Sequence, residues 1–315
     1  MELSIQTAGL AERYGMDKAC QIIKNAGFTA VELQLDYAWL SGNVYNGQLP
    51  KENIFDKPIE DIVAFYKNDI DIIKKNGIKP IQAHAPFPAY VFDHPEILDY
   101  AINTYKKCIE YCNIIGVKNL VIHGISRPRG CELSYEQVHE LNVKLYSSLI
   151  PSLEGTNVTV CLENLFTTHS GHDSIEGICS DPYEAVMYID MFNGMCKDGV
   201  EHFGLCLDTG HLHLIRGEFY QYITILGNRI KCTHIHDNNG YYDEHLAPYA
   251  GTIEWNRFIQ GFKSIDYKGY FSVETFNHYS TWKKSLPEEL VIPMVNTIGV
   301  MVKYFADAVE GEENK

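Results

Sequence analysis

The sequence predicts a single (β/α)8 TIM barrel of the α/β class. Eight short apolar runs, rich in β-branched residues, alternate with amphipathic segments of helical length from one end of the 315-residue chain to the other. No low-complexity linker interrupts this alternation, which favours one domain built on a parallel sheet. We expect the barrel to span residues 1–309, and residues 310–315, EGEENK, to form a solvated C-terminal tail.

The expected strands lie at 3–8, 30–36, 80–86, 119–125, 158–165, 203–209, 230–237 and 269–275. Helical spacing of apolar residues follows the first four of these strands, at 16–27, 59–77, 94–116 and 134–153. Three of these segments end in Ala-Gly, Asn-Gly or Ile-Gly, where glycine supplies the left-handed cap that ends a helix.

Alternation along the expected strands supports the barrel independently, because residues two apart share a face of a strand. If Glu163 points inward, Cys161 does too, and Leu162 faces the helices. The same register applies around Asp208 and Glu274. Small or polar residues therefore fill the barrel, and the acidic residues point into it near the C-terminal strand ends, which form the usual active-site face of this fold.

The bulk properties argue against several classes of protein. A net charge of -15 disfavours a general affinity for nucleic acid or anionic membranes. Nine cysteines without a CxxC pair indicate reduced thiols, and the strand-like start MELSIQTAG lacks the pattern of a secretory signal, so we expect a cytoplasmic protein. The apolar stretch 290–309 contains Pro293, Asn296 and Lys303, which favours an amphipathic closing helix over a membrane span.

Nine acidic and imidazole side chains lie at the ends of the expected strands or in one loop just after them. Carboxylate oxygens and imidazole nitrogens are ligands of divalent metals, and packing alone does not explain a polar end on so many apolar strands. The nine residues are His84, His123, Glu163, Asp208, His211, His234, Asp243, His245 and Glu274.

Four of these residues predict one divalent metal site. Glu163, Asp208 and Glu274 are inward carboxylates, which are costly to bury unless a cation pairs with them. His234 ends the strand that lies between those of Asp208 and Glu274. Because the four residues occupy consecutive strands, we expect them to converge on one ion.

The remaining five residues have two interpretations. His84 and His123 end neighbouring strands and can complete a second site that shares the strand-five glutamate. His211, Asp243 and His245 can hold a further ion, which makes up to three ions in all. Alternatively, these side chains hydrogen-bond a polyol substrate, since both roles need polar groups that converge on one cavity.

His236 and several loop aromatics are further candidates for the site. His236 points inward by alternation and precedes an Asp-Asn turn, so we expect it to act as a supporting hydrogen-bond partner. Trp39 follows the second expected strand and can stack on a sugar ring, although packing or a contact between subunits of a homo-oligomer explains it equally. The same alternatives apply to Tyr37, Tyr45, Tyr279 and Trp282.

Four motifs together resemble those of the xylose isomerase-like TIM-barrel proteins: LENL, CLDTGH, HIHDNNG followed by DEHLAPYAGTIEW, and SVETF. That superfamily includes sugar-phosphate isomerases and epimerases, ketose 3-epimerases, inosose dehydratases and abasic-site nucleases of the endonuclease IV type. Its epimerase branch implies one Mn, Zn, Co or Mg ion held by Glu163, Asp208, His234 and Glu274. Glu163 and Glu274 would then exchange protons with carbon, and His211 would contact substrate oxygens.

The nuclease branch implies that all nine residues hold three zinc ions. In that branch Glu163 is shared between the ion bound by His84 and His123 and the central ion, and His211, Asp243 and His245 hold the third. However, ENLFTTHS replaces the glycine-rich segment expected after the strand-five glutamate, and HIHDNN lacks the expected basic residue.

The sequence therefore favours a metal-dependent isomerase or epimerase that acts on a small sugar, sugar phosphate or polyol through an enediolate. Nucleic acid is not the expected partner. The alternatives are a zinc-dependent phosphodiesterase of the endonuclease IV type and a non-catalytic sugar-binding protein of the same fold.

Overall fold

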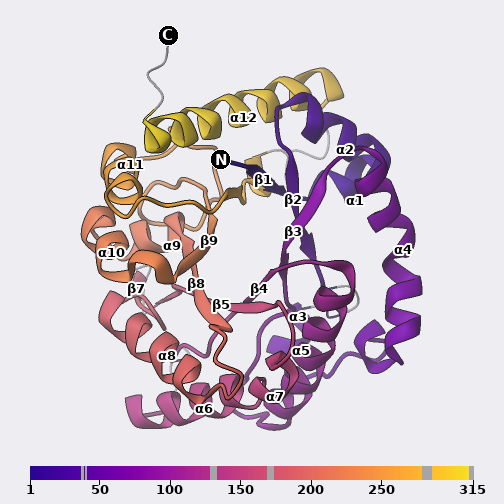
Figure 1. The fold of residues 1–315 in the computed structure, drawn as a ribbon, viewed down its shortest axis with the longest axis vertical. Coiled ribbons are helices and arrows are strands. Elements are labelled where there is room, and N and C mark those ends of the chain that lie inside the picture. The colour runs from indigo at the N-terminus through magenta and orange to yellow at the C-terminus, as the bar shows by residue number, and fades with distance from the viewer. Residues whose placement is uncertain (37–38, 40, 128–132, 169–173, 279–285, 312–315) are drawn as a thin grey trace.

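In the part of the chain that the structure describes, eight parallel strands form a nearly closed barrel surrounded by helices (Figure 1), which confirms the predicted fold class. This computed structural model describes residues 1–315 apart from 37–38, 40, 128–132, 169–173, 279–285 and 312–315. The barrel strands are β1 (Leu3–Gln6), β2 (Ala30–Gln34), β3 (Lys79–His84), β4 (Asn119–Ile122), β5 (Thr159–Glu163), β8 (Phe203–Asp208), β9 (Ile230–His234) and β10 (Phe271–Val273).

The ring closes between the last two strands and the first. Strand β10 pairs with β1 in parallel, and Ile235, just after β9, bridges to β10. The N–H of Ile235 donates to the carbonyl of Ser272 at 2.8 Å, and the N–H of Glu274 donates to the carbonyl of Ile235 at 3.0 Å. The C-terminal ends of β9 and β10 are thereby held side by side, where two of the predicted metal ligands lie.

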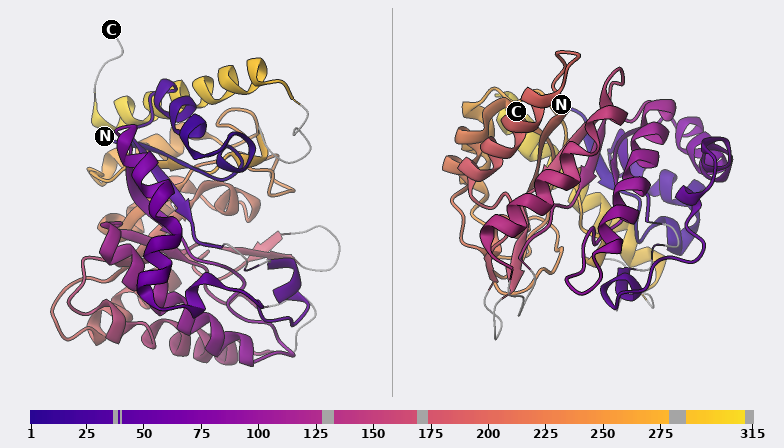
Figure 2. Two further views of the ribbon diagram at one scale, coloured as in Figure 1. Left: turned by 90° about the vertical axis from the view of Figure 1, so that its right-hand side faces the viewer. Right: turned by 90° about the horizontal axis from the view of Figure 1, so that it is seen from below.

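The helices surround the strands as the sequence predicts (Figure 1, Figure 2). The capping box of Ser134 and Gln137 begins the helix after β4, and Gly116, in the left-handed conformation, ends the helix after β3. The helices are α1 (Ala11–Tyr14), α2 (Met16–Asn25), α3 (Ser41–Tyr45), α4 (Ile59–Lys75), α5 (Glu96–Ile115), α6 (Tyr135–Ser147), α7 (Ile150–Leu153), α8 (Pro182–Met195), α9 (Thr209–Leu214), α10 (Phe219–Leu226), α11 (Trp255–Ser264) and α12 (Glu288–Glu310), with 3-10 turns η1 (Ile54–Asp56), η2 (Gly227–Arg229) and η3 (Phe276–His278).

The predicted division between the inside and the outside of the barrel is correct. Val121, Cys161, Cys206 and Cys232 form a small cluster of their own, whereas Leu162 and the other outward residues join the large core between strands and helices. The eight cysteines among the described residues are unpaired thiols, and Cys131 lies outside those residues. Below the ends of β4, β5, β8 and β9 the barrel interior is therefore apolar.

The sequence did not predict a hairpin that follows β5. Strands β6 (Phe166–Thr168) and β7 (Ser174–Glu176) pair in antiparallel register outside the barrel sheet. The predicted fifth strand, 158–165, is longer than β5 because the chain leaves the barrel after Glu163: the N–H of Leu165 donates to the carbonyl of Ile178 at 2.9 Å. The hairpin places Phe166 above the strand ends.

Helix α12 is long and apolar enough to cross a bilayer by length and composition, but its apolar face packs on the barrel beside α2 and α11 (Figure 1). Val291, Ile298 and Phe305 are fully buried. The helix extends to Glu310, one residue into the predicted tail, and the N-terminal ammonium of Met1 pairs with the Glu310 carboxylate at 2.6 Å. Most of the predicted tail, 312–315, lies outside the described residues.

Replacing Gly299 by alanine tests this packing. A Cβ at position 299 would lie 2.0 Å from the carbonyl oxygen of Ala26, so α12 must move away from α2. We expect Gly299→Ala to lower the free energy of unfolding by about 1–3 kcal/mol. Gly194→Ala is the matched control, because a Cβ there meets nothing within 4 Å and alanine favours the helix by up to about 1 kcal/mol. Thermal unfolding followed by circular dichroism measures the melting temperature of each variant. Equal melting temperatures for the two variants would contradict the close packing of α12 on α2.

Candidate metal centre

The structure brings together the four residues predicted to share one ion. Glu163, Asp208 and His234 end β5, β8 and β9, and Glu274 follows β10. One ligand atom from each lies within 4.8 Å of those from the other three, and all four residues are buried. Nδ1 of His234 lies 3.2 Å from Glu163 Oε1, 3.3 Å from Glu274 Oε2 and 3.9 Å from Asp208 Oδ2. These separations fit ligands that surround one ion at about 2.0–2.3 Å.

A second cluster lies beside the other oxygen of Glu163. No donor among the described residues makes a hydrogen bond of ordinary geometry to Glu163 Oε2, although it is buried. Nε2 of His123 lies 2.9 Å away and Nε2 of His84 3.7 Å away, and these two nitrogens are 3.1 Å apart. Two imidazole nitrogens and a carboxylate oxygen this close together fit a cation between them.

A third cluster surrounds the carboxylate of Asp243. Nε2 of His211 and Nε2 of His245 lie 3.4 Å and 3.0 Å from Asp243 Oδ2. The other oxygen of Asp243, Oδ1, is buried and has no hydrogen-bond partner among the described residues. This arrangement also presents two imidazole nitrogens and a carboxylate to one point, as a divalent ion requires.

Backbone carbonyls orient three of the outer imidazole rings. Nδ1 of His84 lies 2.7 Å from the carbonyl oxygen of Ala85. Nδ1 of His211 lies 3.1 Å from the carbonyl oxygen of Asn164, and Nδ1 of His245 lies 3.0 Å from that of Glu274. A carbonyl only accepts, so Nδ1 keeps a proton in each ring, and Nε2 is the nitrogen whose lone pair would face the cluster once that nitrogen is deprotonated. This tautomer is the one that a metal ligand needs.

The loop after β9 delivers Asp243 and His245, and a buried carboxylate fixes that loop. Asp237 accepts hydrogen bonds from the N–H of Ile253 and from the indole N–H of Trp255, both at 3.1 Å. His245 has φ of 48°, a left-handed conformation that is costly for a side chain with a Cβ. Its two ring contacts to Glu274 and Asp243 hold it there.

Carboxylates and imidazoles shift one another's protonation strongly in the central cluster. Burial, the largest influence, would raise the pKa of the Glu163 carboxyl, but the charges on His123 and His234 bring it well below its ordinary value. Burial would lower the pKa of His234, but Glu32, Glu274 and Glu163 raise it well above its ordinary value. Protonated imidazole therefore balances the buried carboxylate charge when no ion is bound.

The third cluster behaves in the same way. Burial favours a higher pKa for Asp243, but His245 and His211 bring it well below its ordinary value. Burial favours a lower pKa for His211 and His245, yet Asp208 and Asp243 raise the pKa of His211 well above its ordinary value, and Asp243 raises that of His245 to about 9. An ion that binds here must displace these protons.

Glu32 on β2 was missed by the sequence analysis. This carboxylate is fully buried inside the barrel, and its Oε2 lies 3.0 Å from Nε2 of His234. The amide of Gln82 donates to the same oxygen, and the amide of Gln6 lies 3.3 Å from Oε1. The alternation that identified Glu163 also places Glu32 inward, between outward Val31 and Leu33, so the signal was present in the sequence.

A cavity of about 660 Å³ opens above the three clusters. A phenylalanine ring packs on one histidine of the second cluster and on one of the third. The ring centroids of Phe87 and His123 are 4.6 Å apart, and those of Phe276 and His245 are also 4.6 Å apart. Phe166 from the hairpin packs in the same way on His211 at 5.1 Å. The predicted residues that line the cavity are His84, His123, Glu163, His211, Asp243, His245 and Glu274.

The weaker candidates have different positions. Trp39 is fully buried, stacks on Tyr100 at 5.7 Å and does not line the cavity, whereas Tyr45 does. Nε2 of His236 lies 3.0 Å from Asp208 Oδ2, which is the kind of supporting contact expected of it. A Cβ at Gly210 would lie 1.9 Å from the His236 ring, so only glycine fits there. Tyr37, Tyr279 and Trp282 lie outside the described residues.

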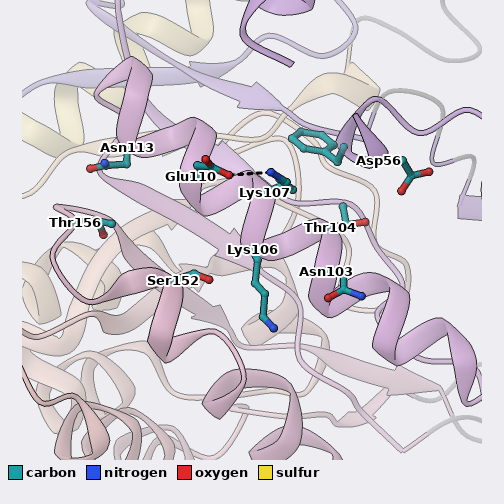
Figure 3. A pocket seen from close by; sticks show the side chains of 10 residues that line it. Asp56, Asn103, Thr104, Lys106, Lys107, Glu110, Asn113, Ser152 and Thr156 are labelled. Atoms are coloured by element: carbon teal, nitrogen blue, oxygen red, sulfur yellow. Dashed lines mark hydrogen bonds and ion pairs between the residues drawn. The ribbon is translucent and has the colours of Figure 1, made fainter. Parts of the chain in front are cut away.

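A second hollow, of about 530 Å³, lies among the outer helices (Figure 3). Its lining includes Lys106, Thr104 and an ion pair between Lys107 and Glu110 at 3.1 Å. None of the described residues that line it is a histidine or a cysteine. The combination of imidazoles and carboxylates found at the barrel mouth is therefore not repeated among the described residues of this hollow.

The chain belongs to the xylose isomerase-like TIM barrel family, because residues 20–292 match the sequence model of that family. Among curated relatives, protein y4fM of Sinorhizobium fredii is 24% identical over 279 residues, which cover 83% of this chain and 81% of the relative. The probable endonuclease 4 of Mesoplasma florum is 29% identical over 181 residues, which cover 53% of this chain and 56% of the relative.

Solved structures show the same fold. A D-tagatose 3-epimerase-like protein is 19% identical with a TM-score of 0.67, and covers 99% of both chains. The IolI protein, solved with a zinc atom, is 18% identical with a TM-score of 0.66, and covers 100% of both chains. At these identities the likeness is one of fold; the family match over residues 20–292 is what confirms the resemblance inferred from the four motifs.

Metal affinity should increase with pH. His211 and His234 have a raised pKa and hold protons near neutral pH, and a metal can take their lone pairs only when those protons leave. We expect the Kd for Zn²⁺ to fall by about tenfold per pH unit for each proton released between pH 6 and pH 8. Chelator competition measures the affinity, and calorimetry in buffers of different ionisation enthalpy counts the protons.

His202→Gln is the control for this prediction. His202 is also fully buried, but its ring contacts the carbonyl of Val158 and the carboxylate of Asp198, at the opposite ends of the strands from the clusters. Its replacement should leave the pH slope unchanged. An affinity that stayed constant or fell as pH rose would show that these imidazoles do not bind the ion.

Proposed function

We propose that this protein is a metal-dependent isomerase or epimerase that acts on a small sugar, sugar phosphate or related polyol by proton transfer through an enediolate. The observation that carries the proposal is a pair of buried glutamates, Glu163 and Glu274, that line one cavity and both contact His234. The epimerase-like protein of the same fold supports it. The unpaired thiols among the described residues fit a cytoplasmic location.

The two glutamates approach the cavity from separate directions. Around the closed barrel, β8 and β9 stand between β5 and β10. Glu163 and Glu274 therefore reach the centre from different sides. Glu163 Oε2 makes no hydrogen bond of ordinary geometry within the described part of the chain and can accept a proton, whereas Glu274 Oε1 is held by the amide of Gln6 at 2.8 Å. One carboxylate can take a proton from carbon while the other returns it on the opposite face.

The residues present fit a divalent ion of the Mn, Zn, Co or Mg type. Glu163, Asp208, His234 and Glu274 would hold it, since their ligand atoms face one point. When bound, such an ion supplies Lewis acidity to adjacent carbonyl and hydroxyl oxygens, which makes the neighbouring C–H more acidic. The outer histidines and Asp243 would bind substrate oxygens or further ions.

The cavity supports a polyhydroxylated substrate. Imidazole nitrogens of His84, His123, His211 and His245 surround it together with Asp243, so donors and acceptors converge from several strands. The phenylalanine rings that pack on these histidines add apolar surface, which suits the C–H face of a sugar. We therefore propose a small molecule as the partner.

A second candidate function is phosphodiester hydrolysis at abasic sites. It is favoured by the nine predicted residues, which fall into three clusters, two of them sharing Glu163, and by the relative named as a probable endonuclease 4. The net charge of -15 argues against it, because binding to a nucleic acid backbone depends on neutralising phosphates. A non-catalytic role is less favoured, since a binding protein needs no paired proton-transfer groups.

Solvent exchange into substrate tests the two-glutamate proposal. With candidate ketoses in deuterated water and metal supplied, the wild-type protein should place deuterium on the carbon next to the carbonyl. Glu163→Gln and Glu274→Gln should each lose at least about 10²–10⁴-fold in rate, the usual contribution of general acid–base catalysis, and metal binding should weaken as well. Mass spectrometry of the recovered sugar measures the exchange.

Glu184→Gln is the control, because this half-buried glutamate on α8 contacts the N–H of Cys179 and lies outside the cavity lining. It should keep wild-type exchange. Full activity in either active-site variant would remove the two-glutamate mechanism, and turnover without deuterium would indicate a hydride shift or internal return of the proton.

Abasic-site duplex DNA tests the second candidate. We expect zinc-loaded protein to cut this DNA no faster than the Glu163→Gln variant, because the acidic surface repels the phosphate backbone. Denaturing electrophoresis of a labelled duplex measures the product. Rapid incision by wild-type protein alone would reverse the order of the two functions.

A further inference from the structure

We infer that Glu32 is a positioning residue that orients His234 toward the metal by accepting the proton on Nε2. The inference rests on the proposed metal-dependent function, and it adds a residue outside the nine candidate ligands. Glu32 lies in the middle of β2 and points into the barrel. Its direct contact with a candidate ligand is the one to the His234 ring.

The His234 ring spans the distance between Glu32 and the central cluster. Nε2 lies 3.0 Å from Glu32 Oε2, and Nδ1 faces the carboxylates of Glu163 and Glu274 at 3.2 Å and 3.3 Å. A neutral imidazole carries one proton, and a ligand nitrogen must present its lone pair. With a metal bound at Nδ1, the remaining proton lies on Nε2, where Glu32 accepts it.

His234 differs in this respect from the outer histidines. The rings of His84, His211 and His245 are each held by a backbone carbonyl, whereas His234 is held by a carboxylate. A carboxylate is a stronger acceptor than a carbonyl and makes the ring a more basic ligand. The central ion would therefore gain a stronger imidazole ligand than the outer sites.

Glu32 is itself fixed by two amides from neighbouring strands. Gln82 on β3 donates to Oε2, and Gln6 on β1 lies 3.3 Å from Oε1. The same amide nitrogen of Gln6 lies 2.8 Å from Glu274 Oε1. Strands β1 and β2, which carry none of the four central ligands, thus contact two of those ligands through this network.

The burial of Glu32 is consistent with this role. Its side chain is fully buried, and its hydrogen-bond partners among the described residues are His234 and the two glutamines. Because the glutamines are neutral, His234 or an ion behind it must balance the carboxylate. A purely structural network would need no charge at this position, and its loss would change stability without changing metal affinity.

Zinc affinity separates these two roles. Chelator competition on the full chain at pH 7.5 should give a Kd for the tightest ion about 10–100-fold weaker in Glu32→Gln than in wild type, the usual cost of losing such a partner. Glu184→Gln removes the same charge far from the site and should bind as wild type does. Equal affinity in wild type and Glu32→Gln would overturn the inference while leaving the metal site intact.

Nitrogen-15 spectra of the histidine rings supply an independent readout. In the zinc-loaded wild type, His234 should show a metal-bound Nδ1 and a slowly exchanging proton on Nε2 that resonates downfield. Glu32→Asp keeps the buried charge, but its shorter side chain withdraws the carboxylate from Nε2. This variant should therefore lose the proton signal and bind zinc more weakly. It also tests the inference if Glu32→Gln does not fold. Wild-type protein that binds no zinc would overturn the metal site itself, and an unchanged proton signal in Glu32→Asp would overturn the role of Glu32.

Discussion

The organisation of the barrel mouth depends on how buried carboxylates are balanced. Five carboxylates, buried or half-buried, lie within 4 Å of imidazole nitrogens: those of Glu32, Glu163, Asp208, Asp243 and Glu274. An arginine or lysine would neutralise them permanently, because its lone pairs are unavailable to a metal at neutral pH. Imidazole can release its proton and bind a cation through the same nitrogen. The choice of histidine would therefore let protons and a metal ion exchange at one set of atoms.

The scaffold supplies the precision that this exchange requires. Parallel strand ends place one ligand each at the same level, and backbone carbonyls or Glu32 select which ring nitrogen faces inward. The loop after β9 has no such regular support, and the buried Asp237 takes over that role by binding the backbone at Ile253 and the indole of Trp255. His245 keeps a left-handed backbone conformation because both of its ring nitrogens are engaged. Local strain is thus retained where it directs a ligand.

The sequence predicted the barrel and the four central residues because both depend on simple periodicities. Strand alternation determines which residues point inward, and Glu163, Asp208 and Glu274 follow from it directly. Glu32 obeys the same rule, but it lies in mid-strand instead of at a strand end, so a search for polar strand ends missed it. The hairpin β6–β7 and the buried position of Trp39 depend on tertiary contacts, with Ile178 and Tyr100, that no local pattern encodes.

The choice between the two candidate chemistries depends on a single oxygen. Glu163 Oε1 faces the central cluster, while Oε2 lies 2.9 Å from Nε2 of His123 and 3.7 Å from Nε2 of His84. If Oε2 bridges to a second ion, its basicity falls and it can no longer take a proton from carbon, which leaves an arrangement suited to activating water. If the second cluster binds substrate oxygens instead, Oε2 stays a free base in a desolvated cavity. The occupancy of the cluster around His84 and His123 would therefore determine the reaction, although the nine predicted residues are the same in both cases.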